Sequence, residues 1–198
     1  MSYSNPVFIP GPTNLPESVR RAIDLPTIDH RSPAFAEAMP KLFAGLKSIF
    51  ATKSPHIFVF PSTGTGGWEA TIANTLSPGD KVLACRHGVF SDKWIRMCEA
   101  FGLVVDVIEC DWRGPADPAL IEAALLADQN HAIKAVLATH NETATGVRSD
   151  LRRFGSQSIE PNITRCFLLM ESVPSLRWIS RWMRGVLMLQ SRALRKGS

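Results

Sequence analysis

Short apolar runs alternate with helix-like segments along the middle of the chain, and this alternation constrains the fold more than any other feature. Four runs suit buried strands, at residues 56–60, 81–85, 103–108 and 133–138. Helices are expected between and before them, at residues 17–23, 35–50, 68–76, 90–101 and 118–127. Strands and helices that alternate at this spacing form βαβ units. The sequence therefore predicts an α/β fold, a mostly parallel sheet with helices on both faces.

Composition places the chain among globular proteins of about one domain. Its 198 residues are 45% hydrophobic, which excludes disorder, collagen and low-complexity fibre. No run of 18 apolar residues occurs, and the start lacks the features of a secretory signal, so we expect a cytoplasmic protein without a membrane partner. The four cysteines lack the spacing of a metal site and are expected to be free thiols.

Charge divides the chain into two segments. Residues 1–150 carry 13 Lys and Arg against 16 Asp and Glu, a net −3, whereas residues 151–198 carry 9 against 2, a net +7. Eight of the nine tail cations are Arg. We therefore expect 1–150 to be one folded part and 151–198 to be a tail of different origin.

The loops after the predicted strands carry the candidate chemistry, because ligands of open α/β sheets bind at the carboxyl ends of the strands. The turn at residues 62–67 is rich in Gly, Ser and Thr and leads into a helix, where backbone N–H groups can bind a phosphate. It lacks the Gly-Lys-Ser/Thr ending of a nucleotide P-loop. The alternative is a turn with a structural role alone.

Two further loops follow the next strands. Phe90 could stack on a flat ligand or simply belong to the core. In the polar cluster at residues 139–146, His140, Asn141 and Thr143 could hydrogen-bond a ring substituent or could cap a turn.

Four ordered motifs, over residues 10–15, 29–33, 62–70 and 139–147, resemble those of the class V aminotransferases. The resemblance is strongest to serine–glyoxylate and alanine–glyoxylate aminotransferases, and it covers residues 7–150. It implies a fold-type I transaminase that depends on pyridoxal phosphate, forms a homodimer, binds no nucleic acid and transfers an amino group between a small amino acid, serine or alanine, and glyoxylate.

The resemblance also assigns roles to single residues. It implies that Thr63, Gly64 and Thr65 hold the cofactor phosphate and that Phe90 stacks on the pyridine ring. The remaining residues that it assigns are Thr143, near the 3-oxygen of the ring, Asn141 beside it, and Gly11 at the substrate site.

The family's other two functional groups are absent as motifs from the tail. They are an acid that pairs with the pyridinium nitrogen and a lysine that forms the Schiff base. One shifted reading frame recovers Asp-Gly-Val from codons for residues 169–172 and Thr-Gly-Ser-Gln-Lys-Gly-Phe from codons for residues 191–198. We therefore hypothesise a frameshift shortly after residue 150. Met170 would then stand at the place of the acid, and Lys196 would fall near that of the Schiff-base lysine.

The sequence leaves other functions open. A cysteine desulfurase or another class V lyase shares the family's fold but needs a mobile catalytic Cys. The tail also mixes Arg with Trp at residues 177–184, which could bind nucleic acid or a lipid surface, or could be a peptide without a function. The interpretation that we favour is a truncated aminotransferase with little or no activity.

Overall fold

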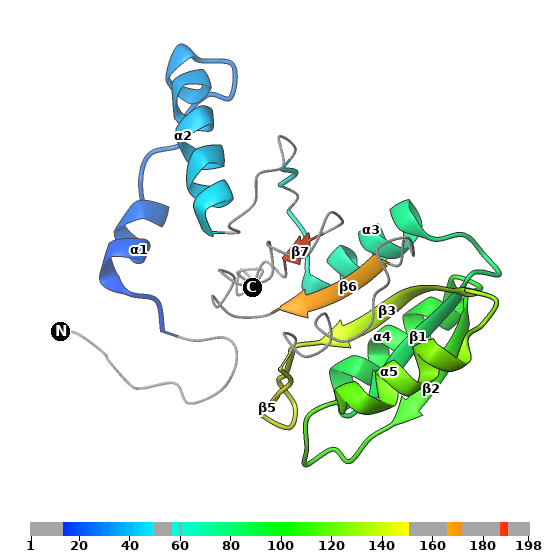
Figure 1. The fold of residues 1–198 in the computed structure, drawn as a ribbon. Coiled ribbons are helices and arrows are strands. Elements are labelled where there is room, and N and C mark those ends of the chain that lie inside the picture. The colour runs from blue at the N-terminus through cyan, green and yellow to red at the C-terminus, as the bar shows by residue number, and fades with distance from the viewer. Residues whose placement is uncertain (1–13, 50–56, 60, 151–165, 172–186, 190–198) are drawn as a thin grey trace.

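The computed structural model describes residues 14–49, 57–59, 61–150, 166–171 and 187–189. A five-stranded parallel sheet runs in the order β2-β1-β3-β6-β7, and a two-stranded hairpin, β4-β5, follows β3 (Figure 1). The helices are α1 (Glu17–Ile23), α2 (Pro33–Ile49), α3 (Gly64–Thr75), α4 (Val89–Ala100) and α5 (Pro118–Ala127). The strands are β1 (Lys81–Arg86), β2 (Val104–Glu109), β3 (Ile133–Thr139), β4 (Asn141–Glu142), β5 (Val147–Arg148), β6 (Cys166–Glu171) and β7 (Leu187–Leu189).

Helices cover both faces of the sheet, which confirms the predicted fold class. Successive β1 side chains point to opposite faces. Val82 and Ala84 pack with α3 and α4, whereas Leu83 and Cys85 pack with Ile121 of α5. Because both of its faces are buried, β1 is apolar along its whole centre rather than alternating in polarity.

The core on the α3 and α4 side contains a pair of stacked indole rings. The Trp68 and Trp94 ring centroids lie 5.5 Å apart with an interplanar angle of 16°. Both side chains are buried. Stacked aromatic pairs of this size contribute about 1 kcal/mol beyond the burial of their area. The pair therefore fixes α3 against α4.

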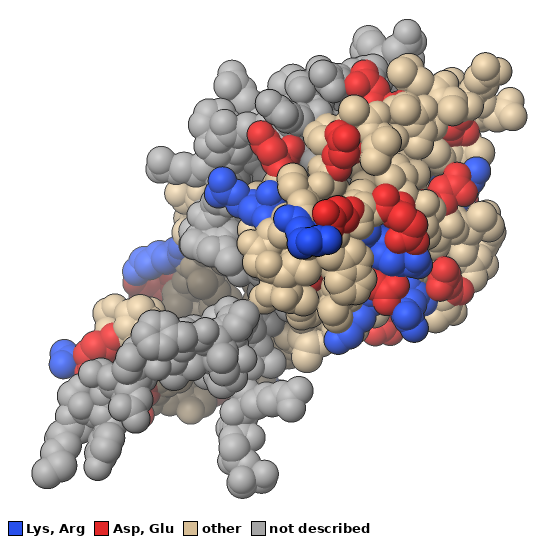
Figure 2. Space-filling view, turned by 90° about the horizontal axis from the view of Figure 1, so that it is seen from below, with Lys and Arg blue, Asp and Glu red and all other residues tan. Residues whose placement is uncertain are grey.

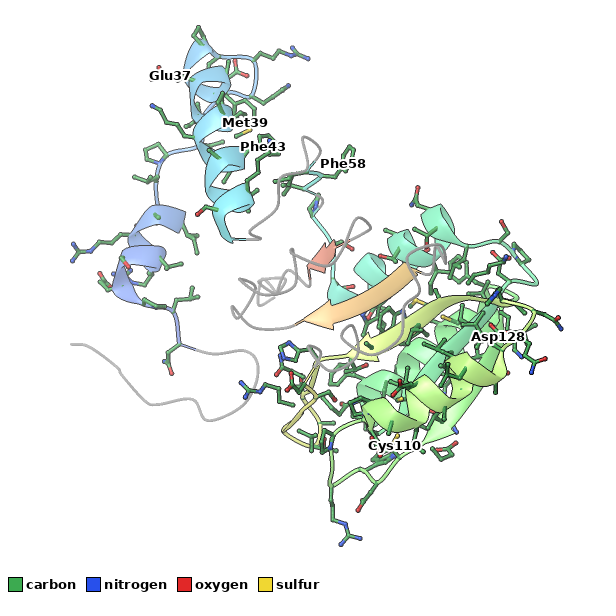
Figure 3. All side chains as sticks on the ribbon, viewed as in Figure 1. Glu37, Met39, Phe43, Phe58, Cys110 and Asp128 are labelled. Carbon is green, nitrogen blue, oxygen red and sulfur yellow. The ribbon has the colours of Figure 1, made fainter. Side chains whose placement is uncertain are left out.

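Two expectations for the N-terminal part are wrong. Residues 57–59 form no strand, and Phe58 and Val59 are largely exposed; His56 and Phe60 lie outside the described residues. An apolar run becomes a strand only where a neighbour pairs with its backbone, and none of the described strands does so here. The apolar residues of α2 recur every three or four positions, a spacing that predicts a helix face turned to a core. Met39 and Phe43 lie on one side of the helix (Figure 3), but both are half-exposed.

In the tail, β6 and β7 extend the sheet beyond β3. Cys166 pairs with Ala135, and the register places Met170 opposite Thr139, at the carboxyl end of β3. Gly11 and Lys196 lie outside the described residues, as does most of segment 151–198. Among the helices that the structure describes, none combines the length and apolarity needed to cross a membrane.

Candidate cofactor site

Three polar segments meet near the carboxyl ends of β1 and β3. The turn before α4 follows β1 directly, and hairpin β4-β5 follows β3. In Figure 1, α3 begins on the side to which the arrowheads of β3 and β6 point. Contacts of α4 with both α3 and β4 connect the three segments. This edge is where the sequence predicted a ligand.

The first turn of α3 has backbone donors that are free to bind an anion. Thr63 is the N-cap, and its hydroxyl oxygen accepts a hydrogen bond from Gly66 N at 3.3 Å. Gly67 N donates to Thr63 O at 3.1 Å. Within the described chain, the N–H groups of Gly64 and Thr65 meet no acceptor. Thr63, Gly64 and Thr65 thus place two free donors at the positive end of a 12-residue helix.

Helix α3 begins four residues earlier than the sequence predicted, so the Gly-rich segment is its first turn. The Thr63 cap explains this start, since it satisfies a donor of the first turn. A Cβ atom at Gly66 would overlap Ser62 Oγ, so the Ser62 hydroxyl occupies the space that the glycine leaves. A compact turn with free N–H groups can accept a phosphate, as the anion-binding interpretation requires.

Phe90 is the second residue of α4, and its ring is half-buried on the rim of the core. Lys93 Nζ lies 5.5 Å from the ring centroid, within the range of a cation–π contact. The residue therefore packs against the core, as the simpler interpretation proposed, while part of it stays exposed.

Asn141 and Thr143 flank a buried residue in the hairpin. Asn141 pairs with Arg148 in β5, and both Asn141 and Thr143 are half-buried. Gly146, with φ of 74°, closes the turn by donating from its N–H to Glu142 O at 2.9 Å. The hairpin therefore presents its polar side chains from a fixed backbone.

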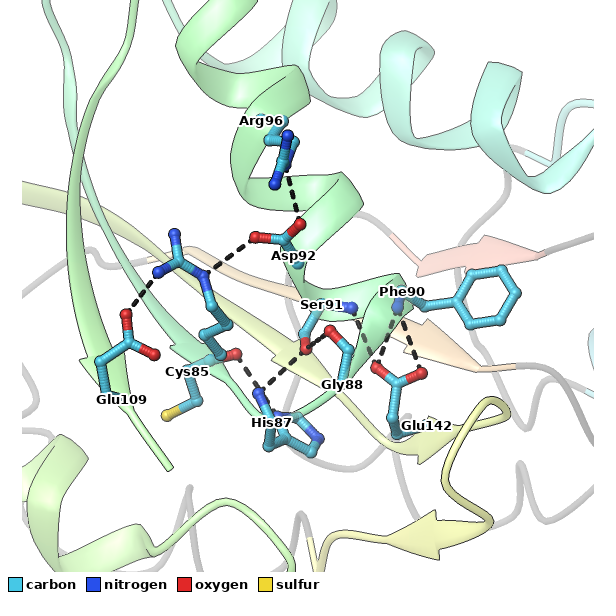
Figure 4. A network of polar contacts seen from close by, with 10 residues as sticks. Cys85, His87, Gly88, Phe90, Ser91, Asp92, Arg96, Glu109 and Glu142 are labelled. Atoms are coloured by element: carbon cyan, nitrogen blue, oxygen red, sulfur yellow. Dashed lines mark hydrogen bonds and ion pairs between the residues drawn. The ribbon is translucent and has the colours of Figure 1, made fainter. Parts of the chain in front are cut away.

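Glu142 is the residue that the sequence reasoning missed. Its side chain is fully buried and crosses from the hairpin to the start of α4, where its carboxylate accepts hydrogen bonds from the backbone N–H groups of Phe90 and Ser91 (Figure 4). Its place in the polar cluster at residues 139–146 was the only feature of the sequence that pointed to Glu142. No local pattern indicates a contact between residues 52 positions apart.

An ion-pair network supports the other side of the same turn. Arg86, at the end of β1, contacts Glu109 at the end of β2 and Asp92 in the first turn of α4, the latter at 3.0 Å. Arg96 reaches Asp92 at 2.8 Å. On the face shown in Figure 2, basic and acidic side chains are interspersed in this way rather than gathered by sign.

The buried thiols are held in their protonated form. Burial raises the pKa of Cys98 to about 12, with a smaller contribution from Glu99. Burial also raises the pKa of Cys85, and the neighbouring Cys110 thiol (Figure 3) adds to the effect. The described residues contain no group of three or more His, Cys, Asp or Glu that could hold a metal ion.

A parallel α/β sheet with an anion-competent helix N-terminus and polar loops at its carboxyl edge defines a class of proteins that bind phosphorylated ligands. The family model for class-V aminotransferases matches residues 16–166. The chain belongs to the class-V aminotransferase family, whose members are pyridoxal-phosphate-dependent enzymes.

Named relatives agree with this assignment. The chain is 55% identical over 151 residues to L-aspartate–glyoxylate aminotransferase of Paracoccus denitrificans, covering 76% of this chain and 38% of the relative. It is 51% identical over 152 residues to serine–glyoxylate aminotransferase of Hyphomicrobium methylovorum, covering 76% and 37%. The matched part thus spans less than half the length of these relatives.

A solved structure agrees as well. The crystal structure of ureidoglycine–glyoxylate aminotransferase from Bacillus subtilis superposes with a TM-score of 0.72 at 27% identity, covering 81% of this chain and 40% of that one. The likeness extends over most of the described fold.

Proposed function

We propose that residues 1–150 form the cofactor-binding part of a glyoxylate aminotransferase. The observation that carries this proposal is the first turn of α3, where the free N–H groups of Gly64 and Thr65 lie beside the Thr63 cap. They would hold the phosphate of pyridoxal phosphate. When bound, the cofactor supplies an electron sink for bonds to the α-carbon of an amino acid.

The other site residues would act on the ring. Phe90 would cover one face of the pyridine, because its half-buried ring lies on the rim of the same edge. Asn141 and Thr143 would hydrogen-bond the 3-oxygen, and Gly11 would line the substrate site. These roles orient the cofactor and exclude water from one of its faces.

Glyoxylate as the amino acceptor is supported by the names of the relatives, which share it. Their amino donors differ, being aspartate, serine and ureidoglycine by name. We propose a small amino acid, serine or alanine, as the donor. A homodimer is proposed on the same family grounds.

We further propose that these 198 residues by themselves have little or no transaminase activity. Position 170 lies opposite Thr139 at the carboxyl edge, beside the hairpin that carries Asn141 and Thr143. An Asp restored there by the shifted reading frame would therefore stand at the site, whereas Met cannot pair with a protonated ring nitrogen. Lys196 lacks the neighbours of the family's lysine motif.

Two of the thiols are unsuited to be the nucleophile of a class V lyase, the alternative whose mobile catalytic Cys would come from beyond this chain. Cys85 and Cys98 are buried, and their raised pKa values leave them as thiols at neutral pH. The Arg and Trp residues at 177–184, on which the alternative binding function rests, lie outside the described residues.

The experiment that tests the proposal is a titration of the purified chain with pyridoxal phosphate. We expect saturable quenching of tryptophan fluorescence, competition by inorganic phosphate, and no pyridoxyl adduct on lysine after borohydride reduction. A version re-coded into the shifted frame after residue 150 should form that adduct. Absence of competition by phosphate would contradict the site, and an adduct on Lys196 would contradict the inactive tail. Gene codons unable to yield the two motifs would contradict the frameshift.

A further inference from the structure

Glu142 is a buried carboxylate without a cationic partner. Its side chain has no measurable exposure, and no described Lys, Arg or His forms an ion pair with it. A buried charge costs several kcal/mol unless hydrogen bonds compensate it. The hydrogen bonds that Glu142 accepts must therefore offset the cost of burying it.

Backbone N–H groups from two different loops supply that compensation. Phe90 N donates to both carboxylate oxygens at 3.1 Å, and Ser91 N donates to Oε2 at 3.0 Å. Ala144 N, on the hairpin itself, donates to Oε1 at 3.3 Å. The carboxylate therefore joins the start of α4 to the loop that carries Asn141 and Thr143 (Figure 4).

The start of α4 depends on this carboxylate because its own N-cap residue is Gly88, which has no side chain to accept a hydrogen bond. Gly88 has an extended backbone, with φ of 168°, that any residue can adopt. A Cβ atom there would nevertheless overlap Cγ and Cδ of Glu142. Glycine at position 88 therefore leaves the space through which Glu142 reaches the helix.

The same contact makes the N-termini of α3 and α4 differ in their ability to bind an anion. The negative charge of Glu142 occupies the start of α4 and repels a second anion there. The free N–H groups of α3 remain open to one. A phosphorylated ligand would therefore bind with its phosphate at the start of α3 rather than of α4.

We propose that Glu142 is a positioning residue that holds Phe90 at the cofactor edge. It acts through the backbone of Phe90 and Ser91 and does not touch the ligand. The inference about the ring rests on the proposed function, whereas the hydrogen bonds that it requires can be tested in the protein without any ligand.

The first test compares Glu142→Gln with Glu99→Gln in the full chain. The side-chain amide that replaces the Glu142 carboxylate keeps one acceptor oxygen and turns the other into an NH₂ donor, so it cannot satisfy the donors of both loops, whereas Glu99 is exposed at the other end of α4. Hydrogen exchange measured by NMR should be about tenfold faster for at least one of the Phe90, Ser91 and Ala144 amides in E142Q, and unchanged for all three in E99Q. Equal exchange in E142Q and in the unmodified protein would overturn the proposal.

The second test distinguishes an effect on binding of the cofactor ring from an effect on binding of its phosphate. Affinity for pyridoxal phosphate, measured by fluorescence, should fall about tenfold in E142Q, while affinity for inorganic phosphate stays within about twofold, because the carboxylate holds the Phe90 backbone and leaves α3 untouched. Loss of both in a folded variant would indicate a general structural role and overturn the inference about the ring. If the unmodified chain binds neither ligand, the proposed function fails and the amide exchange still decides whether Glu142 holds the turn.

A second variant covers the case in which E142Q does not fold. Gly88→Ala should displace the carboxylate by steric overlap and speed exchange of the Phe90 and Ser91 amides. In the double variant G88A/E142Q the effects should not add, since the same contact is already lost. Protected amides in a folded G88A variant would contradict the proposal.

Discussion

Gly66 shows how single atoms decide the shape of the phosphate turn. Its missing Cβ leaves room for Ser62 Oγ, while Ser62 Cβ would lie 3.5 Å from an added methyl group, an ordinary contact. The hydroxyl, which ends a rotatable side chain, is therefore the only atom that has to move for alanine at position 66. This requirement could not be predicted from the sequence, because it depends on where the residue before the cap places its side chain.

We expect Gly66→Ala to change the free energy of unfolding by less than about 1 kcal/mol, because the gain in helix propensity offsets the displacement of the Ser62 hydroxyl. With Ser62→Ala added, the same change at position 66 should stabilise the protein, since no hydroxyl has to move. Urea unfolding of the two single variants and the double variant measures the coupling. Additive effects would show that the hydroxyl is not the obstacle.

The thiol of Cys98 makes the stability of the folded protein depend on pH. Its pKa is raised to about 12 by burial, whereas the thiol of the unfolded chain ionises near its ordinary value of 9.0. Between these values the folded form retains a proton that the unfolded form loses, so stability falls as pH rises above about 9 and is unaffected below it. Removing the thiol should make this fall shallower in Cys98→Ala than in the unmodified protein; equal slopes from about pH 8.5 to about pH 10.5 would contradict the prediction.

At the scale of elements, predictions succeeded where local signals define both ends of a helix or strand. Helices α1 and α5 have the predicted bounds, with Pro16 before one and the Asp117 cap before the other. The strand at 56–60 failed because strand formation depends on a neighbour that no local pattern describes. Glu142 was missed for the same reason, since its partners lie in a distant turn.

The cap of α3 can be tested separately from its glycines. Thr63→Ala removes the acceptor for Gly66 N and should cost about 1 kcal/mol of stability, whereas Thr63→Ser should retain most of it. Thermal unfolding of both variants compares them. Equal losses would mean that the methyl group of Thr63, and not its oxygen, stabilises the turn.

At the scale of the whole molecule, α1 and α2 lie apart from the sheet (Figure 1) and α1 has no buried residue. Exposed apolar side chains continue past α1, where Leu25 is 69% and Ile28 is 52% exposed. Surfaces of this kind associate with other protein surfaces. A second copy of the chain, as the family's homodimer implies, is one such surface.

We expect the chain to self-associate, and the double substitution Leu25→Ser and Ile28→Ser to shift it toward monomer. Sedimentation velocity over a roughly tenfold range of concentration measures this. The exposed Leu126 of α5, on the opposite part of the fold, provides the control, because Leu126→Ser should leave association unchanged. Equal effects of the two changes would indicate nonspecific aggregation.

The bond from Glu142 to the start of α4 also sets an order for folding. Glu142 lies 52 residues from Phe90 and 51 from Ser91, and its hairpin follows β3, which pairs with β1. A contact of that separation requires the closure of a long loop, which slows its formation relative to the local turns of α4. During synthesis the turn at Phe90 would leave the ribosome well before the carboxylate that anchors it, so this rim of the site should be among the last parts of residues 81–150 to become rigid.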